Sequence, residues 1–308
     1  MFFNNQNQKA MRNKILSIAA FLLCALVANC QNAALKEVSG FENPESVAAY
    51  KGFLFVSNMG PKMEPEAKDG DGYISKLSRK DGKVIEQKYF TGLNSPKGIY
   101  IRCHTMLVAD VDKVVAIDLR TKKQLYTVDF SGLGTHYLND ITRACCGSYF
   151  VSSTDKNAIY KFCKKGHIKA LPVKGTIEGA NGLYRGCGKL YIANYGRERV
   201  ADGSYGVICL ISKKYKLFKN GGIYDGIQRS CGRLILSDWG KPDDKGNIIV
   251  YKPCKKQMVT LNLGRTINGP SDIYKDCRTH TLWIPAMREG KIVSISMKEI
   301  KRLACQKK

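Results

Sequence analysis

The strongest constraint on the fold is a phrase that the chain repeats. Residues 183–196 read LYRGCGKLYIANYG, and residues 227–240 read IQRSCGRLILSDWG. Four more copies align with these two, and the six copies begin at PESV, PKGI, LNDI, ANGL, YDGI and PSDI. Their starts are 42 to 52 residues apart, a spacing typical of a repeated supersecondary unit.

Each copy predicts four short strands separated by polar turns. Four strands in a repeat of this length are typical of one blade of a β-propeller, so we expect an all-β, six-bladed β-propeller with four antiparallel strands per blade over residues 31–308. A parallel solenoid is the main alternative, but polar turns between four-strand groups favour antiparallel meanders. The segment AALKEVSG at 33–40 is expected to complete the last blade and close the ring.

The N-terminal residues differ from the rest of the chain. Arg12 and Lys14 precede an uncharged apolar run at 15–28, which is too short to span a bilayer and matches the hydrophobic region of a signal peptide. We therefore interpret 1–30 as a signal segment and expect a secreted or periplasmic protein. Lipid anchoring through Cys30 and an uncleaved anchor are the alternatives.

The cysteines predict structural cross-links. Two of the twelve lie in the signal segment, and an even number in an exported chain favours disulfides. Five occupy the first turn of a repeat, and two more end third strands. The predicted pairs are Cys146 (or Cys145) with Cys163, and Cys231 with Cys254. Cys277–Cys305 is possible, Cys187–Cys209 is disfavoured by side-chain parity, and reduced cysteines are the alternative.

The second residue of each copy is polar or charged. In a propeller the innermost strands all begin at one face, here called the top, so these six side chains should surround the top of the central channel. Carboxylate and amide oxygens suit a hard divalent cation, while capping of strand starts is the alternative for each residue alone. The six residues are Glu45, Lys97, Asn139, Asn181, Asp225 and Ser271.

The motifs NPESV, LNDI, ANGLY and YDGI, in this order over most of 41–300, resemble the SMP-30/gluconolactonase/LRE-like family of six-bladed propellers. The resemblance implies one divalent metal ion (calcium, magnesium, manganese or zinc) bound by Glu45, Asn181 and Asp225. It implies a substrate-binding role or a water-mediated metal contact for Asn139, with Asp140 beside it. The implied activity is hydrolysis of a lactone or related ester, with Glu45 or Asp225 as the catalytic base.

Lys97 departs from this pattern. Its ammonium group would pair with Glu45 or Asp225 in place of a metal ion, extend away from the ring, bind an anionic substrate, or act as a base. The first possibility leads to the alternative function: a non-catalytic propeller that binds a ligand or protein.

The net charge of +24 indicates anionic partners. Lysine-rich turns such as RTKK, CKKG and PCKK should surround the bottom face, where an anionic surface or glycan would bind; solubility alone is the alternative. We expect no nucleic-acid partner, because no basic patch contains interleaved aromatic residues. We expect a monomer acting on a small molecule, with the insertion at 61–72 as a lid over the top face.

Overall fold

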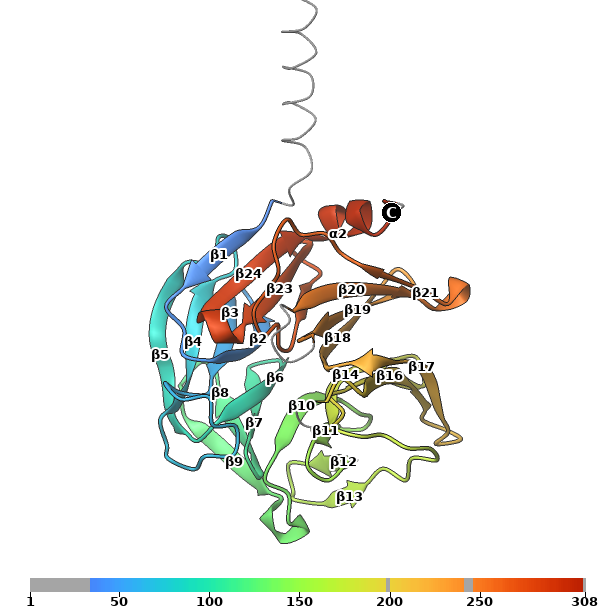
Figure 1. The fold of residues 1–308 in the computed structure, drawn as a ribbon. Coiled ribbons are helices and arrows are strands. Elements are labelled where there is room, and N and C mark those ends of the chain that lie inside the picture. The colour runs from blue at the N-terminus through green and yellow to red at the C-terminus, as the bar shows by residue number, and fades with distance from the viewer. Residues whose placement is uncertain (1–33, 198–199, 241–245, 307–308) are drawn as a thin grey trace, which may run out of the picture.

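The computed structural model describes residues 34–197, 200–240 and 246–306. Six sheets of four strands surround a central channel (Figure 1), which confirms the six-bladed propeller with four antiparallel strands per blade. The predicted signal segment at 1–30 lies outside the described residues. No helix in the described part of the chain is long and apolar enough to cross a membrane.

The blades follow one another in chain order. Within each blade, the first strand lies next to the channel and the later strands lie successively farther from it. Blade one contains β2(Pro44–Tyr50), β3(Phe53–Asn58), β4(Gly72–Ser78) and β5(Val84–Leu93); blade two contains β6(Pro96–Arg102), β7(Thr105–Asp110), β8(Lys113–Asp118) and β9(Gln124–Asp129). Blade three contains β10(Leu138–Arg143), β11(Ser148–Ser153), β12(Ala158–Cys163) and β13(Ile168–Ala170); blade four contains β14(Ala180–Gly186), β15(Lys189–Asn194), β16(Gly203–Cys209) and β17(Tyr215–Gly222). Blade five contains β18(Tyr224–Ser230), β19(Arg233–Asp238), β20(Asn247–Lys252) and β21(Gln257–Thr260).

The sixth blade closes the ring with strands from both ends of the chain. Its order is β22(Tyr274–Asp276), β23(Thr281–Ala286), β24(Lys291–Ser296) and β1(Lys36–Ser39). The predicted closing strand is therefore confirmed, and β1 pairs with β24 over four residues. Asp276 is the last residue of β22, and its buried carboxylate accepts two hydrogen bonds from Arg79 of blade one, at 2.6 and 2.5 Å.

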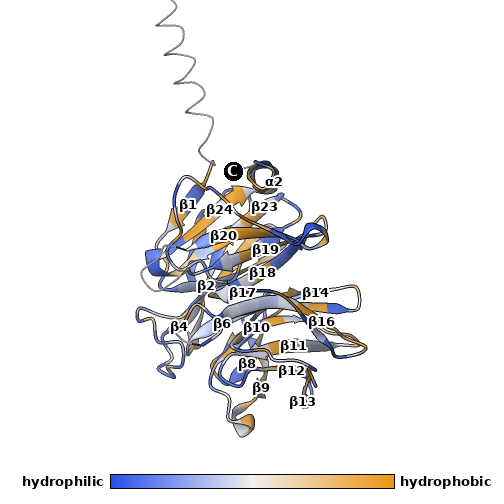
Figure 2. Cartoon of the chain, turned by 45° about the vertical axis from the view of Figure 1, so that its right-hand side comes forward, coloured by the Kyte–Doolittle hydropathy of each residue, from blue (hydrophilic) through white to orange (hydrophobic). Residues whose placement is uncertain are grey.

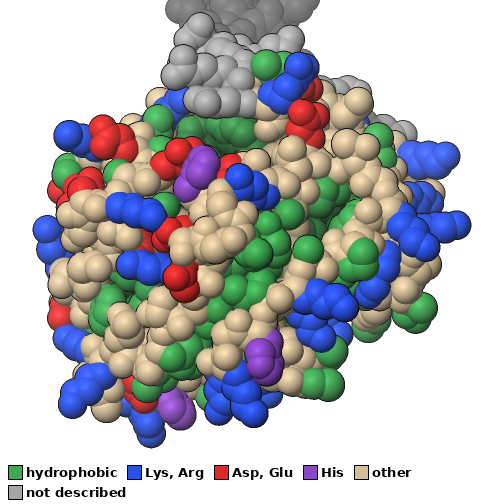
Figure 3. Space-filling view, turned by 90° about the horizontal axis from the view of Figure 1, so that it is seen from below, with side chains coloured by type: hydrophobic (Ala, Val, Ile, Leu, Met, Phe, Trp, Pro, Cys, Tyr) green, Lys and Arg blue, Asp and Glu red, His purple; other side chains and the backbone are tan. Residues whose placement is uncertain are grey.

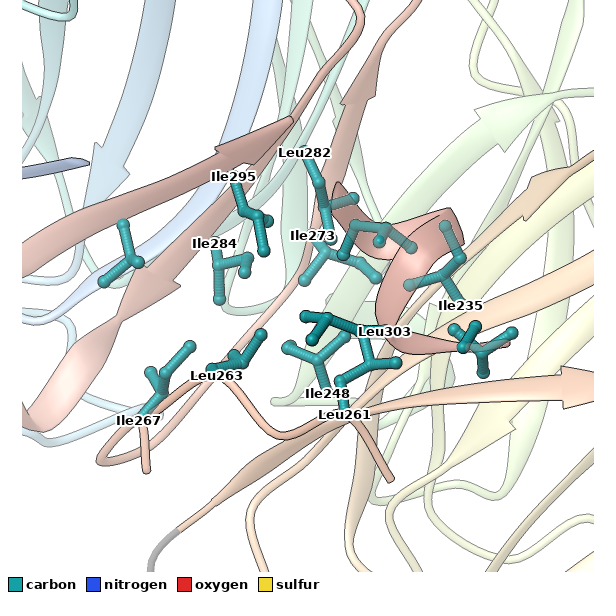
Figure 4. Close-up of a cluster of buried hydrophobic side chains, with 14 of the residues drawn as sticks. Ile235, Ile248, Leu261, Leu263, Ile267, Ile273, Leu282, Ile284, Ile295 and Leu303 are labelled. Atoms are coloured by element: carbon teal, nitrogen blue, oxygen red, sulfur yellow. The ribbon is translucent and has the colours of Figure 1, made fainter. Parts of the chain in front are cut away.

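The hydrophobic core lies between neighbouring blades. Side chains alternate along each strand between the two faces of the sheet, and each face packs against a neighbouring blade. Each interface between two blades therefore buries an apolar cluster. The cluster between blades five and six includes Ile248, Leu261 and Ile284 (Figure 4), together with Leu303 of helix α2(Met297–Leu303). Hydrophobic residues are frequent in the strands, and hydrophilic residues occupy many of the turns (Figure 2).

The cysteines lie where expected but are not paired. All ten in the described part of the chain are free thiols, so the expected Cys146–Cys163 and Cys231–Cys254 disulfides are not formed. The cross-strand partner of Cys163 is Ser148, while Cys146 lies in the preceding turn with φ of 50°. A 3-10 turn, η2(Pro253–Lys255), begins directly after β20. Cys254 therefore lies outside the strand ladder and does not face Cys231.

Basic side chains are unevenly distributed over the surface. On the face shown in Figure 3 the acidic side chains gather mostly in one half, and Lys and Arg dominate the other. The lysine-rich turns predicted from the sequence are exposed, since Lys122, Lys164 and Lys255 all lie in exposed turns.

Candidate functional site at the top of the channel

A repeated irregularity positions the candidate site residues. In blades one to five, the innermost strand contains a β-bulge near its start, so that two of its residues oppose one residue of the next strand. In blade one, Glu45 and Ser46 oppose Ser57. The first residue of each bulge is a predicted ring residue, so the bulge redirects the equivalent side chain in each of these five blades. These residues are Glu45, Lys97, Asn139, Asn181 and Asp225.

Serine hydroxyls of the second strands stabilise three of the bulges. The amide N–H of Ser46 donates to Ser57 Oγ at 2.9 Å, and the N–H of Asp140 donates to Ser152 Oγ at 2.9 Å. Gly226 N–H donates to Ser237 Oγ at 2.8 Å. An N–H that the bulge removes from the ladder is thereby satisfied, which is the usual requirement for a buried donor.

Four side-chain oxygens in this ring are buried and have no hydrogen-bond partner. They are Glu45 Oε2, Asn139 Oδ1, Asn181 Oδ1 and Asp225 Oδ1, one from each of four blades. The four residues are only 2 to 3% exposed. Buried polar atoms are nearly always hydrogen-bonded, so four unpaired acceptors at equivalent positions indicate a site for a cation or donor.

Neighbouring groups fix how these side chains point. Trp239 Nε1 donates to Asp225 Oδ2 at 2.9 Å, which leaves Oδ1 unpaired. The amide nitrogen of Asn139 donates to Thr154 Oγ1 at 3.3 Å, so its oxygen is the unpaired atom. The sequence analysis missed both supporting residues, each of which directly follows the end of a second strand.

The carboxylates of the channel have strongly raised pKa values. Burial, followed by repulsion from Asp225 and Asp272, raises the pKa of Glu45 well above its usual range. Burial and the charge of Asp272 raise the pKa of Asp225 to about 8, and burial raises that of Asp272 to about 7. Without a cation, the site therefore holds protons near neutral pH.

Two further carboxylates form a second layer directly beneath the ring. Asp140 accepts hydrogen bonds from the backbone N–H groups of Ile141 and Leu183, both at 2.6 Å, so it ties β10 to β14. Asp272 accepts from Ser46 Oγ at 2.6 Å. The sequence analysis missed Asp272, although PSDI places it at the same position as the aspartate of LNDI.

Lys97 lies fully buried beside the ring, but its ammonium group does not bond to Glu45 or Asp225. It donates to the backbone carbonyls of Pro65 and Ser95, at 2.5 and 3.1 Å, and lies 4.8 Å from the centre of the Tyr137 ring. Burial lowers the pKa of Lys97 to about 8, while the charge of Glu45 acts in the opposite direction. The lysine thus remains close enough to influence Glu45 electrostatically.

The insertion after β3 is tied down above blades two and three. Besides the bond from Lys97 to Pro65, Lys68 forms an ion pair with Asp112 at 2.5 Å. Glu66 lies 3.1 Å from His136 Nδ1, just before blade three. This arrangement matches the predicted lid over the top face, and it brings His136 to that face.

Side chains at the ends of the second strands do not join the site. Asn58 Oδ1 accepts from the backbone N–H of Glu42, and Asp110 accepts from the N–H groups of Asn94 and Ser95. Asp238 likewise accepts from Ile223 N–H at 3.0 Å. Each therefore holds the loop that leads into the innermost strand, which is a structural role.

The donor set suits a hard cation. Within the described residues there is no group of three or more His, Cys, Asp or Glu side chains placed to hold a metal ion. The ring instead combines two carboxylates with two amide oxygens, a set typical of calcium, magnesium or manganese and less favourable for zinc. The residues present therefore fit a divalent metal ion bound by oxygen.

Comparison with solved structures supports the fold. No protein-family model and no curated protein matches the chain. Two structures of virginiamycin B lyase from Staphylococcus aureus, one of them a catalytically inactive variant with quinupristin, match with TM-scores of 0.56. Each is 16% identical, and the match covers 85% of this chain and 98% of the lyase.

A third match is the extracellular domain of the B. thetaiotaomicron protein BT4673, with a TM-score of 0.55 and 12% identity. It covers 81% of this chain but 32% of that one. At these identities the comparisons establish a six-bladed propeller related in structure to virginiamycin B lyase, while the narrower SMP-30/gluconolactonase-like family stays a prediction.

Proposed function

We propose that this protein is a metal-dependent hydrolase of lactones or related esters, with its active site at the top of the central channel. The observation that carries the proposal is the set of four unpaired buried oxygens contributed by Glu45, Asn139, Asn181 and Asp225. All four unpaired atoms are oxygen acceptors, each from a different blade. Oxygen atoms of this kind are the ligands that hard divalent cations prefer.

In this proposal Glu45, Asn181 and Asp225 hold the ion, and Asn139 lies beside it to bind substrate. A divalent cation bound there would polarise an ester carbonyl and lower the pKa of water. Glu45 or Asp225 accepts the proton of the attacking water, and Trp239 keeps Asp225 in position for this step. Lys97 and the lid at 61–72 limit the entry of solvent, and Lys97 completes the substrate site, while Asp140 supports Asn139 by holding β10 against β14.

The test is a measurement of bound metal. We expect one equivalent of calcium, magnesium or manganese per chain in the protein dialysed against each ion, and none in Asp225→Asn. Asp129→Asn, which removes an exposed carboxylate from β9, is the matched control and should bind like the parent. Hydrolysis of gluconolactone, followed by proton release at constant pH, should depend on the same ion.

A non-catalytic binding propeller is the second candidate, and Lys97 favours it. Its buried ammonium already places a positive charge beside Glu45. Failure of the parent protein to bind any of calcium, magnesium, manganese or zinc would reject the hydrolase and leave this candidate. Export through 1–30, a monomeric state and binding of the basic turns to an anionic surface or glycan are further proposals of this kind.

A further inference from the structure

A cavity lies at the bottom end of the channel, opposite the candidate site. Its volume is about 480 Å³, and all six innermost strands contribute to its lining. Asp140 and Asp272 close its inner end, so the layer of buried carboxylates separates it from the top site. A volume of this size is within the usual range for small-molecule sites, roughly 300–1,000 Å³.

Two arginines without partners line the mouth of this bottom cavity. Arg143 and Arg185 each lie four residues after a ring residue, near the end of an innermost strand. Neither side chain has a hydrogen bond or ion pair with any described residue, and Arg185 Nε is buried and unpaired. Both arginines line the same cavity and come from the adjacent innermost strands β10 and β14.

The basic residues at the equivalent positions of the next two blades already have interaction partners. Lys275 Nζ donates to the backbone carbonyl of Arg229 at 2.6 Å, and the Arg229 guanidinium lies 5.8 Å from the centre of the Tyr191 ring. The positive charge available to a ligand is therefore concentrated at Arg143 and Arg185. Two guanidinium groups in one cavity are an effective binding site for a carboxylate, which arginine can hold through two parallel hydrogen bonds.

The walls between the mouth and the inner end combine apolar side chains with those of Thr142, Gln228 and three tyrosines. Ile99, Ile141, Leu183 and Ile273 line the middle of the cavity, and each is at most 6% exposed in the folded chain. The inner end offers only the buried acids Asp140 and Asp272 and no positive charge, so a second negative group would be costly to bury there. The cavity thus favours a molecule with one anionic end at the mouth and an apolar body that points inward.

We propose that the bottom cavity binds a small organic monoanion, whose carboxylate contacts Arg143 and Arg185 and whose hydrocarbon part lies between Ile99, Ile141, Leu183 and Ile273. This site is distinct from the top site and requires no metal ion. It would give the propeller a second ligand at the far end of its channel.

Isothermal titration calorimetry with three probes tests the proposal. Octanoate carries one carboxylate and an apolar tail, acetate carries the charge alone, and suberate carries a carboxylate at each end. We expect octanoate to bind at least about tenfold more tightly than acetate or suberate. The Arg143→Gln/Arg185→Gln variant should lose at least about tenfold in octanoate affinity, as expected for two charge-assisted contacts.

Two controls make the result decisive. Lys216→Gln/Lys219→Gln removes two exposed charges from the outer strand β17 and should bind octanoate like the parent. Ala49→Glu introduces a carboxylate at the equivalent position of blade one, where it would pair with the arginines, and should also abolish binding while both arginines remain. Absence of octanoate binding, equal affinity for suberate, or full affinity in the folded double-arginine variant would overturn the proposal.

Discussion

At the scale of single residues, the most unusual feature is the concentration of buried acids in one channel. Glu45, Asp140, Asp225 and Asp272 are each no more than 7% exposed, and burial is the largest cause of the raised pKa of all four. Charged carboxylates without compensation are costly to bury, so they take up protons or bind a cation. These four carboxyl groups therefore favour the protonated form unless a positive charge lies close to them.

This arrangement predicts that alkaline pH destabilises the metal-free protein. A carboxyl group with a raised pKa in the folded state stabilises the fold below its ordinary pKa of about 3.9, and this contribution is lost as the pH rises through the folded value. For Asp272 and Asp225 those values are about 7 and about 8. In EDTA, the melting temperature should fall between pH 5 and pH 9.

The Asp225→Asn variant provides the control for this profile. Its melting temperature in EDTA should vary less with pH than that of the parent, because one of the titrating groups is gone. Added calcium or magnesium should raise the melting temperature of the parent at pH 9 and have little effect on the variant. A parent profile that stays flat from pH 5 to pH 9 would contradict the assignment.

The fate of Lys97 was beyond prediction from the sequence. The repeat places it in the ring, but four possibilities were compatible with that position: pairing with Glu45 or Asp225, extension away from the ring, binding of an anionic substrate, or action as a base. One of its two observed acceptors, the Pro65 carbonyl, belongs to the insertion at 61–72, which interrupts the repeat. Periodicity predicts the position of a side chain, whereas irregular loops decide what it contacts.

At the scale of elements, the bulged innermost strand is the unit that builds the site. The sequence predicted these strands because their motifs recur with nearly constant spacing to the following strand. It did not predict the bulges, since an extra unpaired residue changes the register without changing the pattern of apolar residues. The serines at 57, 152 and 237 are recognisable only after the register is known.

Close packing of neighbouring innermost strands makes Gly182 essential at its position. A Cβ atom there would overlap the backbone carbonyl oxygen of Asp225 in the adjacent strand β18. Gly182→Ala should therefore destabilise the protein by about 1–3 kcal/mol, the usual cost of overpacking, and should displace Asp225 enough to weaken metal binding. Chemical unfolding in urea measures the first effect, and equilibrium dialysis the second.

Gly52→Ala is the matched control. Gly52 lies in the turn between β2 and β3, has open space where a Cβ would stand, and does not have a positive φ. Its replacement should leave the urea midpoint unchanged or slightly raised. Equal midpoints for the two variants would mean that β14 and β18 can separate without loss of stability.

At the scale of the whole molecule, the repeat predicted the number of blades, their order and the closing strand. The disulfides were the main error, because spacing within a repeat shows which cysteines lie on one face but not whether their strands continue in register. The cysteines of the inner turns instead lie exposed at the bottom face. Closure of the ring thus depends on noncovalent contacts between its two ends.

The ring closure leads to a prediction about the N-terminal strand. Strand β1 covers the edge of β24, and Glu37 forms ion pairs with Lys291 and Arg265, at 3.0 and 2.7 Å. A chain that starts at residue 41 lacks this strand and exposes the ladder edge of β24, which invites pairing with another molecule. Its melting temperature should fall by about 5 °C or more relative to a chain that starts at residue 34.

The same truncation should also change the oligomeric state. Light scattering should detect dimers or larger species only in the chain that starts at residue 41, because an unpaired edge strand in a sheet is a template for association. A synthetic peptide with the sequence of residues 34–40 should restore the monomer by occupying that edge. Unchanged melting and a monomeric truncated chain would show that contacts between blades, rather than β1, hold the ring closed.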